Sequence, residues 1–250
     1  MMIQKISDTY LDNTQVVLSN ELTKKGVGTI LENGFSASQE KYDFFSLVNQ
    51  GDSQAEFDEL LILAKEFQER TKRPILVHLR LGDVTPYTLL DFIEKTRKLG
   101  LQNFLVLSGD KRVNEQGFYT VEDLLRALRK ELGGRVTLAA TVNPADPTAV
   151  EKVESRQSAG ADFLISQISF DSQPLMDLKK ELEQDGLKVQ LVAGMLNQPT
   201  IGQIQWVEKT FGLRVPLAYK ENPKKVNRTV EKSLQIAGFS AFHFFTLPNF

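Results

Sequence analysis

The stretch Gly160-Ala161-Asp162-Phe163-Leu164-Ile165-Ser166-Gln167 decides the fold, because one amphipathic run ends in it and one apolar run begins in it. Glycine directly after an amphipathic run is typical of the left-handed residue that ends a helix. The near-continuous apolar run over 162–166 is typical of a strand that is buried on both faces of a parallel sheet. This stretch therefore predicts one helix-to-strand unit of a parallel α/β fold.

The same unit recurs along the chain, since Gly100, Gly133, Gly186 and Gly238 also stand between an amphipathic run and an apolar run. Eight strands that alternate with helices in 250 residues predict an α/β protein of the (β/α)8 TIM barrel class, formed as one domain over residues 1–250. A doubly wound open sheet is the alternative, although no Gly-x-Gly-x-x-Gly or Walker sequence supports it. The strands are expected at 15–18, 42–48, 74–79, 103–107, 136–140, 162–166, 189–193 and 241–245.

Helices are expected between these strands. The run 121–128 repeats apolar residues at intervals of three and four, which places them on one helix face. Thr85-Pro86 has the form of a capping residue before a proline at the first helical position. A shorter pattern over 27–34 predicts the first helix. Pro216 lacks the backbone donor that a strand needs, so we expect residues 213–224 to form a long loop.

The composition excludes several classes of site and partner. The chain has 30 basic and 32 acidic residues, a net charge of −2, and therefore no field that favours nucleic acid or anionic lipid. It has no cysteine and only two histidines, which excludes disulfides, thiolate nucleophiles, iron–sulfur clusters and a His-rich metal site. No apolar run approaches the ~20 residues of a membrane span, and residues 1–13 lack a signal-peptide core. A cytoplasmic protein is the resulting expectation.

Active sites of such barrels lie at the carboxyl ends of the strands, where polar residues follow the apolar runs. Glu21 and Asp110 are the two acids that stand out there, and Gln167 ends the sixth run. Their structural alternatives are a helix cap or a solvated acid for the carboxylates, and a rim amide for Gln167. His78, inside the third run, is equally compatible with a core histidine. The other polar residues at these ends are Asn49, Gln50, Arg80, Asp83, Thr141, Asn143, Asn197 and Asn249.

Composition and spacing do not give the reaction, but the strand segments resemble the methylenetetrahydrofolate reductase family in the order of that family. Ala193-Gly194-Met195-Leu196 is similar to its seventh strand, and Phe242-His243-Phe244-Phe245-Thr246-Leu247 is similar to its last strand. The opening stretch, continued by Phe170-Asp171, is similar to its sixth strand. The remaining matches are 77–79 with 83–86 in the third strand and 103–110 in the fourth.

The resemblance implies reduction of 5,10-methylenetetrahydrofolate to 5-methyltetrahydrofolate, with FAD as the bound cofactor and NADH or NADPH as the donor. Glu21 falls on the family's general acid, Asp110 on the aspartate near flavin and pterin, and Gln167 on the glutamine that binds the substrate ring. A homo-oligomer is also consistent with the family. The implied partner is a folate small molecule.

The resemblance also implies a set of FAD-contacting positions, with some departures. Ser108 replaces the family's arginine, Arg156 replaces a lysine and Phe245 replaces a tyrosine. Two alternatives therefore stay open: a divergent member with altered or no flavin use in folate-linked methyl transfer, and a non-catalytic folate- or flavin-binding partner subunit. The positions that fall on FAD contacts are His78, Ser108, Gly109, Asp110, Tyr119 and Arg156.

Overall fold

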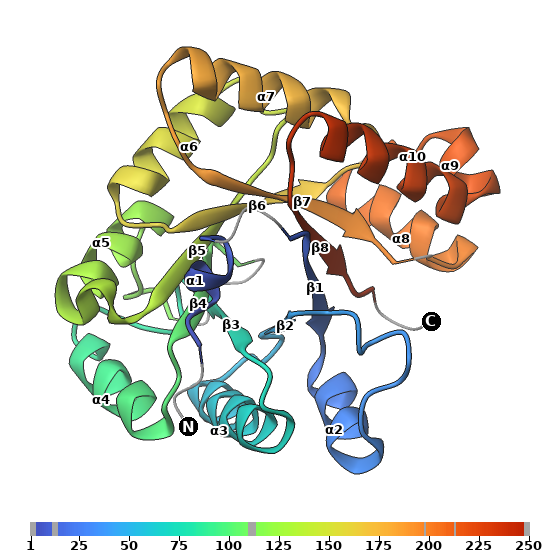
Figure 1. Ribbon diagram of the computed structural model, residues 1–250. Helices are drawn as coiled ribbons and strands as arrows, with labels where there is room; N and C mark the ends of the chain where they lie inside the picture. The colour runs from blue at the N-terminus through green and yellow to red at the C-terminus, as the bar shows by residue number, and fades with distance from the viewer. Residues whose placement is uncertain (1–3, 12–14, 110–113, 198, 213, 248–250) are drawn as a thin grey trace.

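The computed structural model describes residues 4–11, 15–109, 114–197, 199–212 and 214–247. Within these ranges, eight parallel strands pair in sequence order, and the eighth pairs with the first to close a barrel (Figure 1). The TIM barrel prediction is confirmed, and closure excludes the open sheet. The strands are β1 (Val17–Leu22), β2 (Phe44–Leu47), β3 (Ile75–Arg80), β4 (Asn103–Leu107), β5 (Thr137–Val142), β6 (Phe163–Ile168), β7 (Gln190–Leu196) and β8 (Ala241–Phe245).

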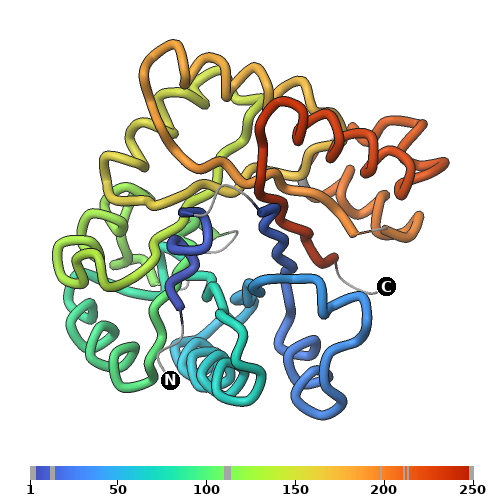
Figure 2. Tube along the Cα trace, in the orientation of Figure 1, coloured from blue at the N-terminus to red at the C-terminus, as the bar shows by residue number. Residues whose placement is uncertain are grey.

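Helices alternate with the strands and surround the barrel, as the trace in Figure 2 shows. A short 3-10 turn at Gly133–Arg135 leads into β5. The helices are α1 (Ile6–Thr9), α2 (Lys24–Asn33), α3 (Gln54–Thr71), α4 (Leu89–Leu99), α5 (Val121–Leu132), α6 (Ala149–Ser158), α7 (Gln173–Gln184), α8 (Ile201–Phe211), α9 (Leu217–Glu221) and α10 (Pro223–Ile236).

The junction at Gly160 follows the sequence prediction. Its φ angle is +108°, a left-handed value that residues with a Cβ rarely adopt. A Cβ atom on Gly160 would also lie 2.8 Å from Cγ of Arg129, whose Nε and Nη2 atoms donate hydrogen bonds to the Gly160 carbonyl oxygen. Because Gly160 has no side chain, the chain can turn there after α6, and Arg129 of α5 can hydrogen-bond to this turn before β6 begins.

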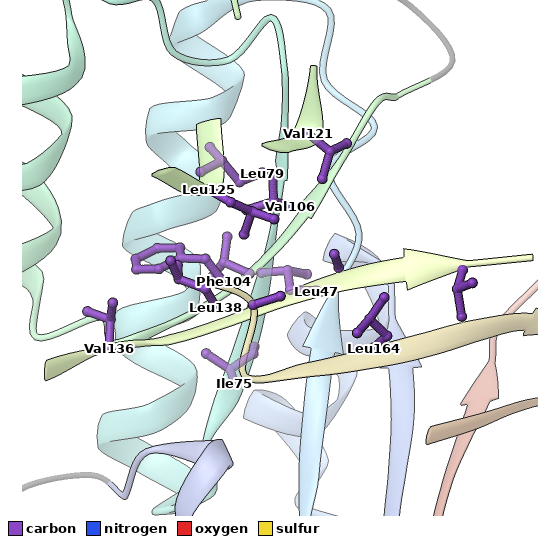
Figure 3. Packing of buried hydrophobic residues seen from close by; sticks show 14 of the residues in the cluster. Leu47, Ile75, Leu79, Phe104, Val106, Val121, Leu125, Val136, Leu138 and Leu164 are labelled. Carbon is purple, nitrogen blue, oxygen red and sulfur yellow. The ribbon is translucent and has the colours of Figure 1, made fainter. Parts of the chain in front are cut away.

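The main apolar core lies between the strands and the surrounding helices. Figure 3 shows Leu79 of β3 and Val106 of β4 packed near Leu125 of α5, and all three side chains are buried. Leu125 belongs to the apolar face predicted over 121–128, so the periodicity of the sequence identified the face that packs on the barrel.

A second apolar cluster fills the inside of the barrel at its amino-terminal end. It contains Phe44, Leu76 and Phe163 from the strands together with Ile6 of α1, which is fully buried. The backbone N–H of Ile6 donates to Oδ1 of Asn103 at the start of β4, 2.8 Å away. The sequence did not predict α1, which closes this end and leaves the carboxyl end of the barrel for the polar side chains.

Some sequence predictions are wrong in part. β1 extends to Leu22, so Glu21 lies inside a strand rather than after it. The segment expected as a long loop contains α9 and the start of α10. Pro216 is the residue just before α9, and Pro223 opens α10, where its missing N–H would have no partner inside the helix anyway.

Candidate active site

Glu21 of β1 and His78 of β3 face each other inside the barrel near its carboxyl end. Oε2 of Glu21 lies 3.8 Å from Nε2 of His78, and the residues are 8% and 7% exposed. The two strands are separated by β2, so the contact crosses the barrel interior, where inward side chains of alternate strands share a layer. A carboxyl group and an imidazole are thus brought together away from bulk water.

Burial favours the uncharged form of both groups. It raises the pKa of Glu21 from 4.5 to about 8, although a hydrogen bond from the Thr246 backbone acts in the opposite direction. Burial also lowers the pKa of His78 to about 4. At neutral pH the contact therefore joins a protonated carboxyl group to a neutral imidazole. It is not an ion pair, and Glu21 holds a proton that it can donate.

A second buried histidine lies beneath this pair. Nδ1 of His243 on β8 is hydrogen-bonded to Oγ of Ser19, 2.8 Å away, and Nε2 lies 3.5 Å from Oγ of Ser46. Burial, followed by the nearby His78, lowers the pKa of His243 to about 3. His243 is fully buried and neutral, and it connects β8 to β1 and β2 below the layer of Glu21.

Gln167 lies at the end of β6, where the pairing with β7 is irregular. The register shifts between Ile165 and Ile168, which is the signature of a β-bulge. Oε1 of Gln167 accepts a hydrogen bond from the backbone N–H of Ile168, 3.0 Å away. This contact fixes the amide oxygen of the half-buried side chain.

The bulge depends on Gly194 of β7. A Cβ atom there would lie 2.2 Å from the Ser166 carbonyl oxygen and 2.7 Å from the Phe245 ring. The Gly194 N–H instead donates to Oγ of Ser166 at 2.9 Å, and its carbonyl oxygen accepts from the N–H of Ser169 at 2.8 Å. A bare backbone at this position therefore lets β6, β7 and β8 meet closely beside Gln167.

A buried polar network closes the opposite side of the mouth, after β2 and β3. Arg80 donates through Nε and Nη2 to Oδ1 of Asp83, at 3.1 and 2.8 Å, and through Nη2 to the Gly51 carbonyl oxygen at 2.7 Å. The side-chain amide of Asn49 donates to Oδ2 of Asp83 at 2.8 Å. The sequence analysis placed these polar residues at the strand ends. Their side chains hydrogen-bond to one another and join the loops after β2 and β3.

The remaining predicted contacts lie at different places around the mouth. Ser108 is exposed, and Gly109 has a φ of +77°, with the Arg80 side chain packed against its α-carbon. Tyr119 is 79% exposed just before α5. Arg156 of α6 pairs with Glu122 of α5 at 3.1 Å and donates to the Thr141 carbonyl oxygen. Asp110 falls outside the residues that the structure describes, as does Asn249.

Two hollows lie near the carboxyl ends of the strands. One of about 270 Å³ is lined by Asn20, Asn197, Gln203 and Thr246, on the outer side of β1 and β8. A wider groove of about 580 Å³ runs between the start of α7 and α9 and α10, with Phe170 and Asp171 on its wall. The groove lies among helices outside the barrel, so the chemistry-bearing pair of Glu21 and His78 is not part of it.

Over the described ranges, no three His, Cys, Asp or Glu side chains gather in a way that could hold a metal ion. In the same part of the chain, no helix has both the length and the apolar character needed to cross a membrane.

The polar layer of Ser19, Ser46 and His243 inside the barrel was not predicted from the sequence. A signal for it was present, because side chains of a strand alternate between its two faces. Once β1 is known to contain Glu21 pointing inward, Ser19 must point inward as well, two residues earlier. The shorter strand expected at 15–18 concealed this relationship.

The sequence matches the model of the family described as methylenetetrahydrofolate reductase over residues 11–247. A protein named methylenetetrahydrofolate reductase 2 from Schizosaccharomyces pombe is 22% identical over 207 residues, which cover 72% of this chain and 32% of the relative. The 5,10-methylenetetrahydrofolate reductase of Pectobacterium carotovorum subsp. carotovorum is 25% identical over 225 residues, covering 81% and 75%. The chain thus spans about a third of the fission-yeast relative and three quarters of the bacterial one.

Similar solved structures include 2,3-dimethylmalate lyase, a member of the PEP mutase/isocitrate lyase superfamily, with a TM-score of 0.60 and 10% identity. That comparison covers 96% of this chain and 79% of the lyase. Oxaloacetate acetylhydrolase has a TM-score of 0.60 at 12% identity, with 98% and 80% covered. At these identities the likeness concerns the barrel fold alone.

Proposed function

Because this chain belongs to the methylenetetrahydrofolate reductase family, we propose that it reduces 5,10-methylenetetrahydrofolate to 5-methyltetrahydrofolate, with bound FAD and NADH or NADPH as the electron donor. The observation that carries the proposal is the buried Glu21 carboxyl group, which is protonated at neutral pH at the mouth of the barrel. A general acid works best when its pKa lies near the working pH.

The reaction needs a hydride at the one-carbon unit and a proton at a ring nitrogen. One carbon–nitrogen bond of the five-membered ring breaks, the released nitrogen takes the proton, and the carbon takes the hydride with its electron pair. Glu21 donates the proton through Oε2 as the ring opens. Its low-polarity surroundings favour the protonated acid in the resting protein and so keep this proton available.

Gln167 is proposed to bind the folate ring, in agreement with the family resemblance. The contact of its amide oxygen with the Ile168 N–H leaves the amide nitrogen as a donor at the rim. Folate rings carry carbonyl and ring-nitrogen acceptors that such a donor can bind. The bulge and Gly194 hold the residue in place, so the ring would meet a donor with a fixed direction.

The described residues fit FAD at the side of β3 and β4. Nε2 of His78 is buried without a hydrogen-bond partner among them, so a polar atom of a bound ligand could supply one. His78, Ser108, Gly109 and the exposed Tyr119 would hold the cofactor there, together with Asp110. When bound, FAD would supply the hydride that it receives from the nicotinamide donor.

One observation favours a second candidate, a divergent family member with altered flavin use. Arg156 already pairs with Glu122 and with the Thr141 carbonyl oxygen, so a phosphate group would have to compete for it. The short side chain of Ser108 stands where the family has an arginine. Both differences concern cofactor contacts, whereas Glu21 and Gln167 are present.

The visible absorbance of the purified protein tests the proposal. We expect a stoichiometric FAD spectrum, after addition of FAD if needed, which NADH or NADPH bleaches and methylenetetrahydrofolate restores. A protein that takes up FAD but is not reduced by either nucleotide would favour a different electron donor. A protein that stays colourless with added FAD would overturn the flavoenzyme proposal and leave folate-linked methyl transfer or a binding role.

A further inference from the structure

We infer that Arg80 is a positioning residue of the cofactor site, because the aliphatic part of its side chain supports the Ser108–Gly109 segment that is proposed to hold FAD. The inference rests on the proposed function, which places FAD beside the carboxyl ends of β3 and β4. Arg80 is the last residue of β3 and pairs with Leu107 of β4, so Gly109 follows two residues after the partner of Arg80. The arginine thus lies where the chain leaves β4.

The contact between Arg80 and Gly109 is direct in the ligand-free protein. A Cβ atom on Gly109 would lie 2.9 Å from Cδ, 3.0 Å from Cγ and 3.1 Å from Cβ of Arg80, the three atoms that form the stem of that side chain. The φ angle of Gly109 is +77°, a left-handed value that favours glycine. Glycine is therefore required here both by the backbone angle and by the arginine stem that fills the space beside it.

The polar end of Arg80 is held from the other side, which fixes the position of the stem. Nε and Nη2 donate to Asp83, and Nη2 also donates to the Gly51 carbonyl oxygen at 2.7 Å. The whole residue is only 6% exposed. A long side chain that is bound at its polar end and packed along its stem has little rotamer freedom left, so it can act as a rigid support for a neighbouring segment.

The chain also returns to the same place before α5. Residues 80–83 form a turn after β3, and a Cβ atom on Gly117 would lie 2.3 Å from the Leu81 carbonyl oxygen of that turn. The backbone N–H of Phe118 donates to the same oxygen at 3.1 Å. Phe118 directly precedes Tyr119, which is also proposed to hold FAD. The proposed cofactor contacts before and after this loop are therefore attached to the turn that Arg80 opens.

A similar arrangement lies at the amino-terminal end of the barrel and provides a comparison. Arg129 pairs with Asp162 at 2.8 Å, and its side chain packs against Gly160, which also has a positive φ angle. Arg129 donates hydrogen bonds to the Gly160 carbonyl oxygen and so holds that turn directly. Arg80 instead directs its hydrogen bonds to the loops after β2 and β3, and it supports Gly109 through its stem.

Two double variants separate the stem from the charge. R80M/D83L and R80A/D83L both lack the ion pair, but methionine keeps an unbranched chain along the path of the stem, whereas alanine removes it. Titration of the flavin-free protein with FAD, followed by flavin fluorescence, gives the dissociation constant. We expect R80M/D83L to stay within about threefold of the natural protein and R80A/D83L to bind FAD about 10- to 100-fold more weakly, because a segment that must be ordered on binding lowers the affinity.

R129A/D162L is the matched control, because it removes the similar arginine and aspartate at the other end of the barrel. We expect thermal stability to fall in R129A/D162L and in R80A/D83L, but FAD affinity to fall only in R80A/D83L. G109A tests the same contact with the arginine retained, since its methyl group would displace the segment or the stem. FAD should bind more weakly to G109A as well. If R80A/D83L does not fold, G109A decides, and an unchanged FAD affinity in G109A would overturn the inference.

Hydrogen exchange of the ligand-free protein tests the support without the cofactor. We expect the peptide that carries Ser108 and Gly109 to exchange faster in R80A/D83L than in R80M/D83L, and at the natural rate in R129A/D162L. Equal FAD affinity in the two Arg80 variants would overturn the role of the stem, and so would equal weakening of FAD binding in R129A/D162L. If the natural protein binds no FAD, the flavoenzyme proposal fails, whereas the exchange rates still decide whether Arg80 supports the segment.

Discussion

Arg80 and Asp83 form a buried pair in which one guanidinium group is bound by one carboxylate at the point where β3 leaves the barrel. Their side chains are 7% and 1% exposed, and Nη2 lies 2.8 Å from Oδ1. Asp83 also accepts from the Arg80 backbone N–H and from the Asn49 amide, at 2.7 and 2.8 Å. The pair thus joins the loops after β2 and β3 into one unit beside the candidate site.

We expect D83L to lower the free energy of unfolding by about 3–5 kcal/mol, because the Arg80 charge would stay buried without its partner. The double variant R80M/D83L should recover much of this loss, since neither charge is then left alone. Urea denaturation measures the free energy of unfolding of both variants, provided that its dependence on urea concentration is the same in each. E94Q on α4 removes an exposed pair with Lys98 and should change stability by less than about 1 kcal/mol. A D83L variant as stable as E94Q would contradict this account.

The activity of Glu21 should depend on pH in one direction. A general acid with a pKa of about 8 is protonated below that pH, so kcat/KM, which reports the ligand-free protein, should be constant near neutrality and fall as pH rises through 8. E21Q cannot donate a proton and should lose about 10²- to 10⁴-fold in kcat while it still folds and binds flavin. Flavin content is measured beside the rate. Equal rates in E21Q and the natural protein would reject the role of Glu21 as donor.

The same pKa predicts a change in stability with pH. A carboxyl group whose folded pKa is raised stabilises the folded state fully below its unfolded value of 4.5, and that contribution is lost as pH rises toward 8. E21Q has no such group, so the difference in unfolding free energy should turn in favour of E21Q by a few kcal/mol between pH 5 and pH 8. Denaturation of both proteins across this range measures it. A difference independent of pH would show that Glu21 is not buried as an acid.

The fold was predictable because its signals are local and repeated. Gly160 ends a helix at a fixed place. The apolar run after it is one of several that alternate with amphipathic runs along the chain. The errors have local causes as well. Thr85 was expected to cap a helix before Pro86, yet it bonds to Thr88 in a turn, and α4 begins at Leu89. Proline fits a turn as well as a first helical turn, so the sequence alone could not distinguish them.

The candidate site was predictable in its position but not in its contacts. The positions of Glu21 and Gln167 at the ends of apolar runs predicted that they lie near the mouth. The partners of each came from other strands: His78 reaches Glu21 across β2, and Gly194 of β7 shapes the bulge of Gln167. Such pairs depend on the stagger between strands as the barrel closes, which no local pattern encodes. The roles of Asp110, Tyr119 and Arg156 stay predictions.

Q167A should raise the KM for methylenetetrahydrofolate by about 10-fold or more, because one hydrogen bond to the folate ring is lost. Flavin binding should be unchanged, since Gln167 is proposed to touch the substrate only. Q190A is the matched control. Gln190 opens β7 at the opposite end of the barrel, and its amide donates to the neighbouring Leu191 carbonyl oxygen. Steady-state kinetics compare the two, and an equal change in KM would argue against a specific contact at Gln167.

Gly194→Ala should lower the free energy of unfolding by about 1–3 kcal/mol and raise the KM for the folate. The new methyl group would lie 2.2 Å from the Ser166 carbonyl oxygen and 2.7 Å from the Phe245 ring, so the backbone of β6 or β7 must move. That movement would displace the bulge that holds Gln167.

Gly28→Ala in α2 is the control, because no atom lies within 4 Å of its added Cβ. Alanine in a helix interior should stabilise the protein by about 0.5–1 kcal/mol, without effect on KM. Thermal denaturation and kinetics of the two variants separate close packing from a general effect of losing glycine. If Gly194→Ala kept both its stability and its KM, the close approach at β7 could not be what positions Gln167.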